Sequence, residues 1–467
     1  MSNHFEKVLE YFKTLTTIPR GSENREGIKN YLCDFAAARG LRYRSDAADN
    51  VVIFKPAAAE YADRAPVILQ GHTDMVCALA EGYTFDFLTE ALHLKQEGDF
   101  LSAQGTSLGG DDGIAVAMML ALLESDIPLP ALECIFTSDE EIGMIGVDAL
   151  DMSDITGKYL INIDSEDEGV LTVSCAGGST AVVKIPYRCH SVNGVQYEIT
   201  LSGLAGGHSG TEIVKGGYNA NKLLGEVLKP LDDYAIISLH GGEKENAIAV
   251  SATVSLVVPH ETDFTPVLEA IKAQCIAQDP DFYYTCRLLG NGTVQAMDKK
   301  STAAVAGALS DLPQGIIKMS AFDPTAVQTS LNLGVLEQEE GAVSFTFCVR
   351  SSVQKEREAL EENIQTIAAA YGGTMALSGI YPSWEYKKDS VLREKAVETF
   401  EKMFGYTPKI ESIHAGLECG VILSKKPELE CISLGPQMYD VHTARERLSI
   451  SSSERTWEYL LALIRAL

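Results

Sequence analysis

Basic residues and long apolar runs are both scarce in this sequence. No apolar stretch approaches the ~20 residues that a membrane-spanning helix needs, and the segment Met1–Lys7 lacks the basic and apolar regions of a secretory signal. Lys and Arg number 38 against 65 Asp and Glu, which gives a formal net charge of −27. Nucleic acid and anionic membranes are therefore not expected as partners, because either would require a cationic face.

The ten cysteines lack any regular spacing. None form a Cys-x-x-Cys motif, and Cys134 and Cys348 lie inside apolar runs. A thiol in such a run behaves as a small hydrophobic residue. The sequence therefore does not predict a disulfide framework, and it favours a reducing, cytoplasmic location.

The length of 467 residues is too great for one hydrophobic core, so two domains are expected. In residues 1–185 and 383–467, short apolar strands alternate with amphipathic helices. This pattern predicts an α/β fold with a mostly parallel mixed sheet that helices cover on both faces. The elements expected first are helices at 5–16, 24–39 and 114–125 and strands at 50–54, 66–70, 134–137 and 159–163.

Residues 186–382 have a different pattern, typical of an α+β domain. We predict an inserted lid and dimerisation domain here, which interrupts the catalytic domain. The order of its elements partly repeats, which suggests an internal duplication, although no sequence identity supports it. The expected elements are strands at 197–201, 247–258, 283–289 and 342–350 and helices at 219–228, 265–278 and 355–371.

Five short segments carry residue types that bind metal ions. Four of them follow predicted strands or begin a helix, and open α/β sheets place ligand sites at the carboxyl ends of their strands. A pair of divalent cations needs imidazoles, several carboxylates and an open face, so these segments predict a two-metal hydrolase site. The segments are Gly71-His72-Thr73-Asp74, Gly109-Gly110-Asp111-Asp112-Gly113, Ser138-Asp139-Glu140-Glu141, Asn162-Ile163-Asp164 and Val441-His442-Thr443.

The pair His72 and Asp74 is the first of these segments. Alternate residues of a strand face the same way, so both side chains are expected on one side. A metal-bound imidazole usually donates its other N–H to a carboxylate, and Asp74 suits that role. Taken alone, the segment is equally typical of a solvated loop.

The acidic segments offer ligands and a base. Asp111 has two oxygens with which to bridge two cations, whereas Asp112 suits the N-cap of the following helix. Glu140 and Glu141 point to opposite sides, so one can bind a metal while the other takes a proton from water. A solvated acidic turn is the alternative for this pair.

Asp164 and His442 complete the predicted set. Two Zn²⁺ ions bring four positive charges, while Asp111, Glu141 and Asp164 bring three negative charges and a hydroxide the fourth. Zinc lowers the pKa of its water to about 7, which supplies that nucleophile. Co²⁺ and Mn²⁺ also tolerate such a mixed nitrogen and oxygen site.

Together, the motifs resemble the co-catalytic zinc peptidases, the family that includes carnosinases, carboxypeptidase G, aminoacylase and tripeptidase T. The resemblance covers nearly the whole chain and is strongest with members that cleave Xaa-His dipeptides. It implies a zinc-exopeptidase-like fold and metal-dependent hydrolysis of dipeptides with broad specificity. A tripeptidase, an N-acyl-amino-acid amidohydrolase and a non-catalytic relict remain alternatives. The best-matching segments are 69–76, 105–114, 160–166 and 413–420.

The resemblance also implies roles at the metal site. Asp74 would orient His72, and Glu140 would be the general base for a metal-bound hydroxide. A cis peptide bond is expected between Asp111 and Asp112. The implied ligands are His72, Asp111 and Asp164 for one ion and His442, Asp111 and Glu141 for the other, with Asp111 as the bridge.

In the predicted lid, the resemblance implies contacts with a small peptide substrate. His208 would stabilise the oxyanion, from its own chain or from the partner subunit of a homodimer formed through the lid. Asn246 and Arg350 would hold the substrate backbone and its C-terminal carboxylate. Gly416 would line the same pocket, and Glu418 would receive the free α-amino group.

Overall fold

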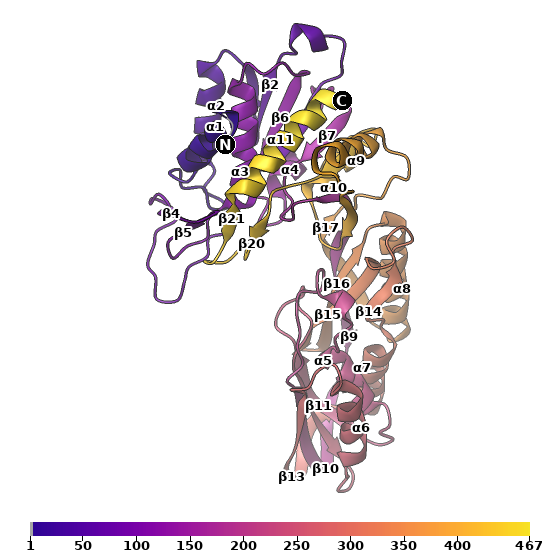
Figure 1. Ribbon diagram of the computed structural model, residues 1–467. Coiled ribbons are helices and arrows are strands. Elements are labelled where there is room, and N and C mark those ends of the chain that lie inside the picture. The colour runs from indigo at the N-terminus through magenta and orange to yellow at the C-terminus, as the bar shows by residue number, and fades with distance from the viewer. Residues whose placement is uncertain (1–2) are drawn as a thin grey trace. The chain divides into compact units, whose positions relative to one another are not determined.

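A computed structural model describes residues 3–467, which form two compact units (Figure 1). The first unit contains the residues up to Ser174 together with Tyr386–Ser412 and Leu417–Leu467, and the second contains Cys175–Glu385 and Ile413–Gly416. Both ends of the chain therefore belong to the first unit.

The first unit is built on an eight-stranded mixed sheet with the order β1-β2-β6-β3-β7-β19-β8-β18. Its central strands β6, β3, β7 and β19 run parallel, and antiparallel strands flank them. The α/β fold with a mixed sheet is thus as predicted. In that order the strands span Arg42–Ser45, Val51–Lys55, Leu132–Thr137, Val67–His72, Tyr159–Asn162, Glu430–Ser433, Val170–Cys175 and Lys409–Ile413.

Seven helices accompany this sheet in the described part of the unit. Helix α1 packs on α3, and α9 packs on α11 (Figure 1). Strands β3 and β6 and nearly all of α3 are buried, which explains why their sequences are continuous apolar runs rather than alternating ones. The helices are α1 Asn3–Leu15, α2 Glu26–Ala38, α3 Gly110–Glu124, α4 Ile145–Ala149, α9 Val391–Phe404, α10 Glu418–Lys425 and α11 Ile450–Ala466.

Strand register in this sheet brings three of the predicted segments to one edge. His72 in β3 lies opposite Thr137 in β6, and Gln70 lies opposite Asn162 in β7. The acidic turn after Thr137 and the carboxylate of Asp164 therefore follow strands that end beside His72.

A small four-stranded sheet brings the late histidine to the same region. Its order is β20-β21-β5-β4, with strands Met438–Tyr439, Arg447–Ser449, Phe100–Ala103 and Leu94–Glu97. The loop 440–446 joins β20 to β21, and β21 pairs with β5 shortly before α3 begins. His442 is thereby carried toward Asp111.

The second unit is a nine-stranded antiparallel sheet with four helices. Strand β9 precedes the boundary at residue 186 that the sequence suggested, yet it pairs here with β16 and β17. The sheet order is β13 Tyr283–Met297, β10 Cys189–Ser202, β12 Ala252–Val258, β11 Ala235–Gly241, β15 Val327–Glu339, β16 Ala342–Ser351, β9 Gly177–Pro186 and β17 Thr374–Tyr381, with β14 Gly315–Met319 beside β15. The helices are α5 Ala220–Leu228, α6 Thr265–Cys275, α7 Lys299–Asp311 and α8 Gln354–Ala370.

One face of this second sheet packs against the four helices, which lie along one side of it in Figure 1. Val343, Phe345, Phe347 and Val349 alternate along β16 and all join the core that the helices share. Because side chains alternate between faces, Arg350, which follows Val349, points to the face away from the helices.

One predicted strand needs correction. The segment 247–258 was predicted as one strand, but the strand begins at Ala252. Asn332 Nδ2 donates hydrogen bonds to the carbonyls of Glu245 and Ala247 and holds that part as a loop.

All ten cysteines are free thiols. None of the helices within residues 3–467 has the length and apolar character to cross a bilayer.

Candidate functional site

His72, Asp111 and Asp164 form the first candidate metal-binding group. Each offers one ligand atom, and these atoms all lie within 4.8 Å of one another. The Nε2 atom of His72 lies 3.0 Å from Asp111 Oδ1 and 3.6 Å from Asp164 Oδ1. A cation at this place would have one imidazole and two carboxylates within reach.

Asp111, Glu141 and His442 form the second group on the same 4.8 Å criterion. The Nε2 atom of His442 lies 3.0 Å from both Asp111 Oδ2 and Glu141 Oε1. Asp111 therefore directs one oxygen to each histidine, which is the arrangement that a carboxylate bridging two cations requires. The five predicted ligands thus come together in two overlapping groups.

The charges in these groups fit divalent cations. Hydrogen bonds to Asp111 and Glu141 raise the pKa of His442 to about 11. The pKa of His72 is also raised, because its carboxylate neighbours outweigh the opposing effect of burial. Burial raises the pKa of Asp164. Both imidazoles therefore have raised pKa values beside buried carboxylates, and divalent cations bound by nitrogen and oxygen donors would supply the positive charge that this place favours.

Asp74 connects His72 to the acidic turn. Its Oδ1 atom lies 3.4 Å from His72 Nδ1, and its carboxylate accepts the backbone N–H groups of Glu140 and Glu141 at 3.0 and 3.3 Å. Burial acts to raise its pKa, but the hydrogen bonds from His72 and Ser22 prevail and lower it to about 2. Asp74 is therefore placed to hold both the imidazole and the turn.

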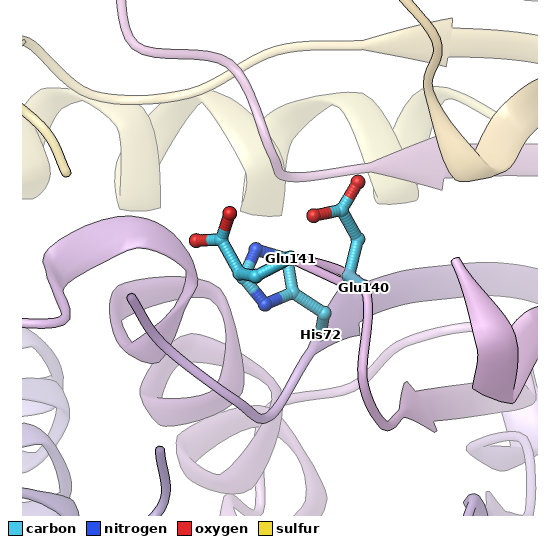
Figure 2. A group of neighbouring side chains, drawn as sticks. All are labelled: His72, Glu140 and Glu141. Atoms are coloured by element: carbon cyan, nitrogen blue, oxygen red, sulfur yellow. The ribbon is translucent and has the colours of Figure 1, made fainter. Parts of the chain in front are cut away.

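Glu140 lies beside the same ring. Figure 2 shows the carboxylates of Glu140 and Glu141 extending from neighbouring backbone positions next to His72, and these three residues form a third group within 4.8 Å. Burial raises the pKa of Glu140 to about 8, with the nearby charge of Glu418 adding to it. The geometry allows Glu140 to act either as a ligand or as a base.

The peptide bond between Asp111 and Asp112 is cis, as the family resemblance implied. Asp112 is fully buried, and its carboxylate accepts the N–H of His72 in β3 at 3.2 Å. This hydrogen bond runs to the sheet and not to the first turn of α3, where an N-cap was expected. A side chain at Gly71 would collide with this carboxylate, which explains the glycine there.

Arg20 was not identified from the sequence. Its buried guanidinium donates from Nη1 to the carbonyls of Thr73 and Asp74 at 2.9 and 3.0 Å and from Nη2 to the carbonyl of Gly109. A Cβ atom on Gly109 or Gly113 would lie 2.5 Å from Nη2, so these glycines provide the space for it. Arg20 ties the His72 segment to the segment before Asp111.

Glu418, the residue suggested to receive the α-amino group, lies at the start of α10. It is 0% exposed, and its Oε2 atom accepts hydrogen bonds from Gln70 Nε2 and Thr137 Oγ1 inside the first unit. Burial raises its pKa to about 7. One oxygen of this enclosed carboxylate thus supports the ends of β3 and β6, while its Oε1 atom has no hydrogen-bond partner.

A row of residues crosses the second sheet on the face away from its helices. Strand register places Ser330 opposite Arg350, Arg350 opposite Gly178, and Gly178 opposite Tyr381. Arg350 is 8% exposed and donates from Nη1 to the Tyr381 hydroxyl at 2.8 Å, while its Nε atom has no partner. Because Gly178 lacks a side chain, the Tyr381 ring lies over it.

Two histidines of the second unit lie near this row. The Nε2 atom of His414 lies 2.7 Å from Ser330 Oγ, and burial together with Arg350 lowers the pKa of His414 to about 3. Burial and Arg350 likewise lower the pKa of His208. The backbone N–H groups of Gly210 and Thr211 donate to His208 Nδ1 at 3.3 Å. A neutral His208 ring therefore carries its proton on Nε2 and can donate it to another group.

The remaining residues predicted to contact the substrate lie on loops of the second unit, which includes Gly416 although the sequence placed it in the catalytic domain. Asn246 is exposed, and its carbonyl accepts the N–H of Ser209 beside His208 at 2.8 Å. Gly416 follows Ala415, whose carbonyl accepts the N–H of Ala176 at 3.1 Å. His208, Arg350 and the loop of Asn246 thus belong to one unit.

Comparisons with known proteins match nearly the whole chain. The sequence pattern described as peptidase family M20/M25/M40 covers residues 68–466. A cytosol non-specific dipeptidase of Escherichia coli (strain K12) is 31% identical over 470 residues, which cover 98% of this chain and 96% of that protein.

Solved structures are similar as well. The crystal structure of an aminoacylhistidine dipeptidase from Vibrio alginolyticus has a TM-score of 0.91 and 31% identity, and the match covers 99% of this chain and 96% of that chain. An aminopeptidase, PepT, from Bacillus cereus has a TM-score of 0.57 and 17% identity, over 99% of this chain and 98% of that chain. The second likeness concerns the fold alone.

Proposed function

Since this chain belongs to peptidase family M20/M25/M40, we propose that it is a cytoplasmic dipeptidase of broad specificity, Xaa-His dipeptides included, that depends on two divalent cations. Relatives that share 31% identity over nearly the full length are named as dipeptidases. The observation that carries the proposal is the position of Asp111, whose two oxygens each lie 3.0 Å from the Nε2 atom of a different histidine.

The proposed chemistry assigns separate tasks to the residues of the first unit. Two cations, most suitably Zn²⁺ and otherwise Co²⁺ or Mn²⁺, would polarise the peptide carbonyl and make a water molecule acidic. His72, Asp111, Glu141, Asp164 and His442 hold them. Glu140 accepts the proton of the attacking water and passes it to the leaving amine. Asp74 keeps the His72 ring and the Glu140 backbone in place.

The second unit supplies the substrate contacts in this proposal. Arg350 binds the C-terminal carboxylate of the peptide, because a guanidinium offers two parallel donors to such a group. His208 donates its Nε2 proton to the oxygen that gains charge in the reaction. Asn246 and Gly416 contact the peptide backbone. The unit also provides the surface for a homodimer, within which His208 serves its own or the partner's site.

A substrate panel run at defined cation loading tests the proposed function. We expect hydrolysis of Xaa-His and other dipeptides, and much slower hydrolysis of the matching tripeptides and N-acyl amino acids. Stripping the protein with a chelator should abolish the activity, and adding back Zn²⁺, Co²⁺ or Mn²⁺ should restore it. Release of free amino acids, measured by chromatography, is the readout.

The panel also separates the alternatives. If tripeptides or N-acyl amino acids are cleaved faster than dipeptides, the protein is a tripeptidase or an N-acyl-amino-acid amidohydrolase on the same scaffold. A protein that binds two cations and cleaves none of the three classes would be a non-catalytic relict.

Replacing Arg350 by lysine tests the substrate contact. A hydrogen bond to a charged group contributes roughly 1.5–3 kcal/mol, so we expect KM for dipeptides to rise about 10–100-fold with little change in kcat. Steady-state kinetics with a dipeptide and its C-terminal amide measure this. The amide lacks the carboxylate, so its KM should already be high with the wild type and should rise little further in the variant.

The matched control is Arg287→Lys, at an exposed arginine of the same sheet that pairs with Glu198. It should keep the wild-type KM. The ratio of the KM values for the amide and the dipeptide should fall in Arg350→Lys. If this ratio stays the same as in the wild type, another group binds the carboxylate.

A further inference from the structure

Glu446 is a buried carboxylate that the proposed chemistry does not use. It is 3% exposed, and none of the candidate metal-binding groups found among residues 3–467 includes it. Its Oε2 atom accepts the backbone N–H groups of Leu108 and Gly109 at 2.7 and 3.0 Å. Its Oε1 atom accepts those of Gly110 and Asp111 at 2.7 and 3.4 Å. One side chain therefore satisfies four successive donors that end at the bridging carboxylate residue.

The start of α3 needs such an acceptor. The first N–H groups of a helix have no partner within it, and the N-cap residue here is Gly109, which has no side chain to offer. The non-helical φ/ψ angles of Asp111 and Asp112 interrupt the helix directly after this start. Glu446 provides two oxygens and a negative charge at the helix end where a negative charge is favourable. A glutamine of the same shape would offer one oxygen and turn an N–H₂ group toward N–H donors.

Glu446 belongs to the same loop as His442. Its N–H donates to the carbonyl of Thr443 at 3.2 Å, so a hydrogen-bonded turn links Glu446 to the residue that follows His442. The His442 side chain is 49% exposed, and its backbone has φ +62°, a conformation that residues other than glycine adopt rarely. Packing alone does not hold an imidazole so exposed, and its place depends on the anchoring of the loop.

We propose that Glu446 is a positioning residue of the metal centre, which sets the separation of Asp111 and His442 by binding the backbone of residues 108–111 from the His442 loop. The inference rests on the proposed metal-dependent function. In this arrangement Arg20 joins the His72 segment to the Gly109 carbonyl. Glu446 joins the N–H groups of residues 108–111 to the loop that contains His442. Asp111 is thus held between the two histidine segments through its own backbone.

Glu446→Gln tests the inference through cation affinity. Loss of a group that orients metal ligands typically costs 10–100-fold in affinity, and we expect a loss of about that size for at least one of the two cations. Zn²⁺ titration of the chelator-stripped full-length protein by calorimetry measures it. The thermal unfolding midpoint of the stripped protein is recorded in parallel, because a merely structural role would lower that midpoint without changing the affinity.

Glu133→Gln is the matched control. Glu133 is also a buried carboxylate (4% exposed), and it accepts the backbone N–H groups of Thr156 and Gly157 at 2.9 Å each. It pairs with Ile68, near the amino ends of β3 and β6, whereas His72 lies at the carboxyl end of β3. We expect Glu133→Gln to lower the unfolding midpoint and to keep the wild-type Zn²⁺ affinity.

The outcomes are distinct. Unchanged Zn²⁺ affinity in Glu446→Gln, or an equal loss in Glu133→Gln, overturns the inference alone. If the wild-type protein binds no Zn²⁺, the titrations are repeated with Co²⁺ and Mn²⁺, and a wild-type protein that binds none of the three overturns the proposed function and the inference with it. If Glu446→Gln does not fold, Glu446→Asp is titrated instead. It keeps the charge but is one methylene shorter, and an affinity loss of about tenfold is expected, while wild-type affinity again overturns the inference.

Discussion

Replacing Glu140 by glutamine is expected to lower kcat for dipeptides about 10²–10⁴-fold while both cations stay bound. Glutamine keeps the size of the side chain but cannot accept a proton from water or return one to the leaving amine. The backbone contact between Glu140 and Asp74 does not involve the altered group, so the turn should keep its place. Stopped-flow or steady-state kinetics measure kcat, and metal analysis of the same sample measures the bound cations.

The neighbouring acid provides the contrast. Glu141→Gln alters the carboxylate that lies 3.0 Å from His442, so this variant should lose cation affinity as well as activity. If Glu140→Gln also loses a cation, then Glu140 is a ligand, which the third group of His72, Glu140 and Glu141 also allows. A Glu140→Gln variant with wild-type kcat would contradict the proposed proton transfer by Glu140.

Much of the first unit and its metal groups could be predicted from sequence because two simple rules act together there. Apolar runs without alternation indicated buried parallel strands, and such strands end at a common edge. His72 ends β3, while the acidic turn and Asp164 follow β6 and β7. His442 lies far away in the sequence, so the strand rule did not place it; the need of a two-metal site for a second imidazole and the resemblance to known peptidases connected it to the others.

The second unit was harder to predict because polar side chains occupy buried strand positions. Strand β15 is almost wholly buried, yet it contains Gln328, Ser330 and Asn332. Each of them is satisfied by a specific partner, such as His414 for Ser330 and the loop before Ala247 for Asn332. Hydrophobic patterning does not reveal such a strand, since it depends on partners that the fold brings from elsewhere.

Arg20 and Glu446 escaped prediction for a different physical reason. Both bind backbone groups, which every residue possesses, so no pairing of residue types in the sequence marks the interaction. Their partners are the carbonyls of Thr73, Asp74 and Gly109 and the N–H groups of residues 108–111. The ligands of a metal site can therefore be found in a sequence more readily than the residues that hold those ligands in position.

Replacing Asp111 by asparagine is expected to reduce the affinity for both cations by more than the 10–100-fold typical of an indirect neighbour, because both candidate groups share this carboxylate. His442→Ala removes a donor from one group only, so it should leave one cation bound. Calorimetric titration of the stripped variants gives the stoichiometry. Equal loss of both cations in His442→Ala would show that the two groups do not bind cations separately.

Proton release during the same titrations provides an independent check on this assignment. The pKa of His442 is raised to about 11 by its bonds to Asp111 and Glu141, so without a cation the ring is protonated at pH 7. A cation must displace that proton before Nε2 can bind it, and apparent affinity should therefore rise with pH through the neutral range. Titrations in two buffers of different ionisation enthalpy count the protons. His442→Ala should release fewer than the wild type, whereas equal release would mean that His442 does not bind a cation.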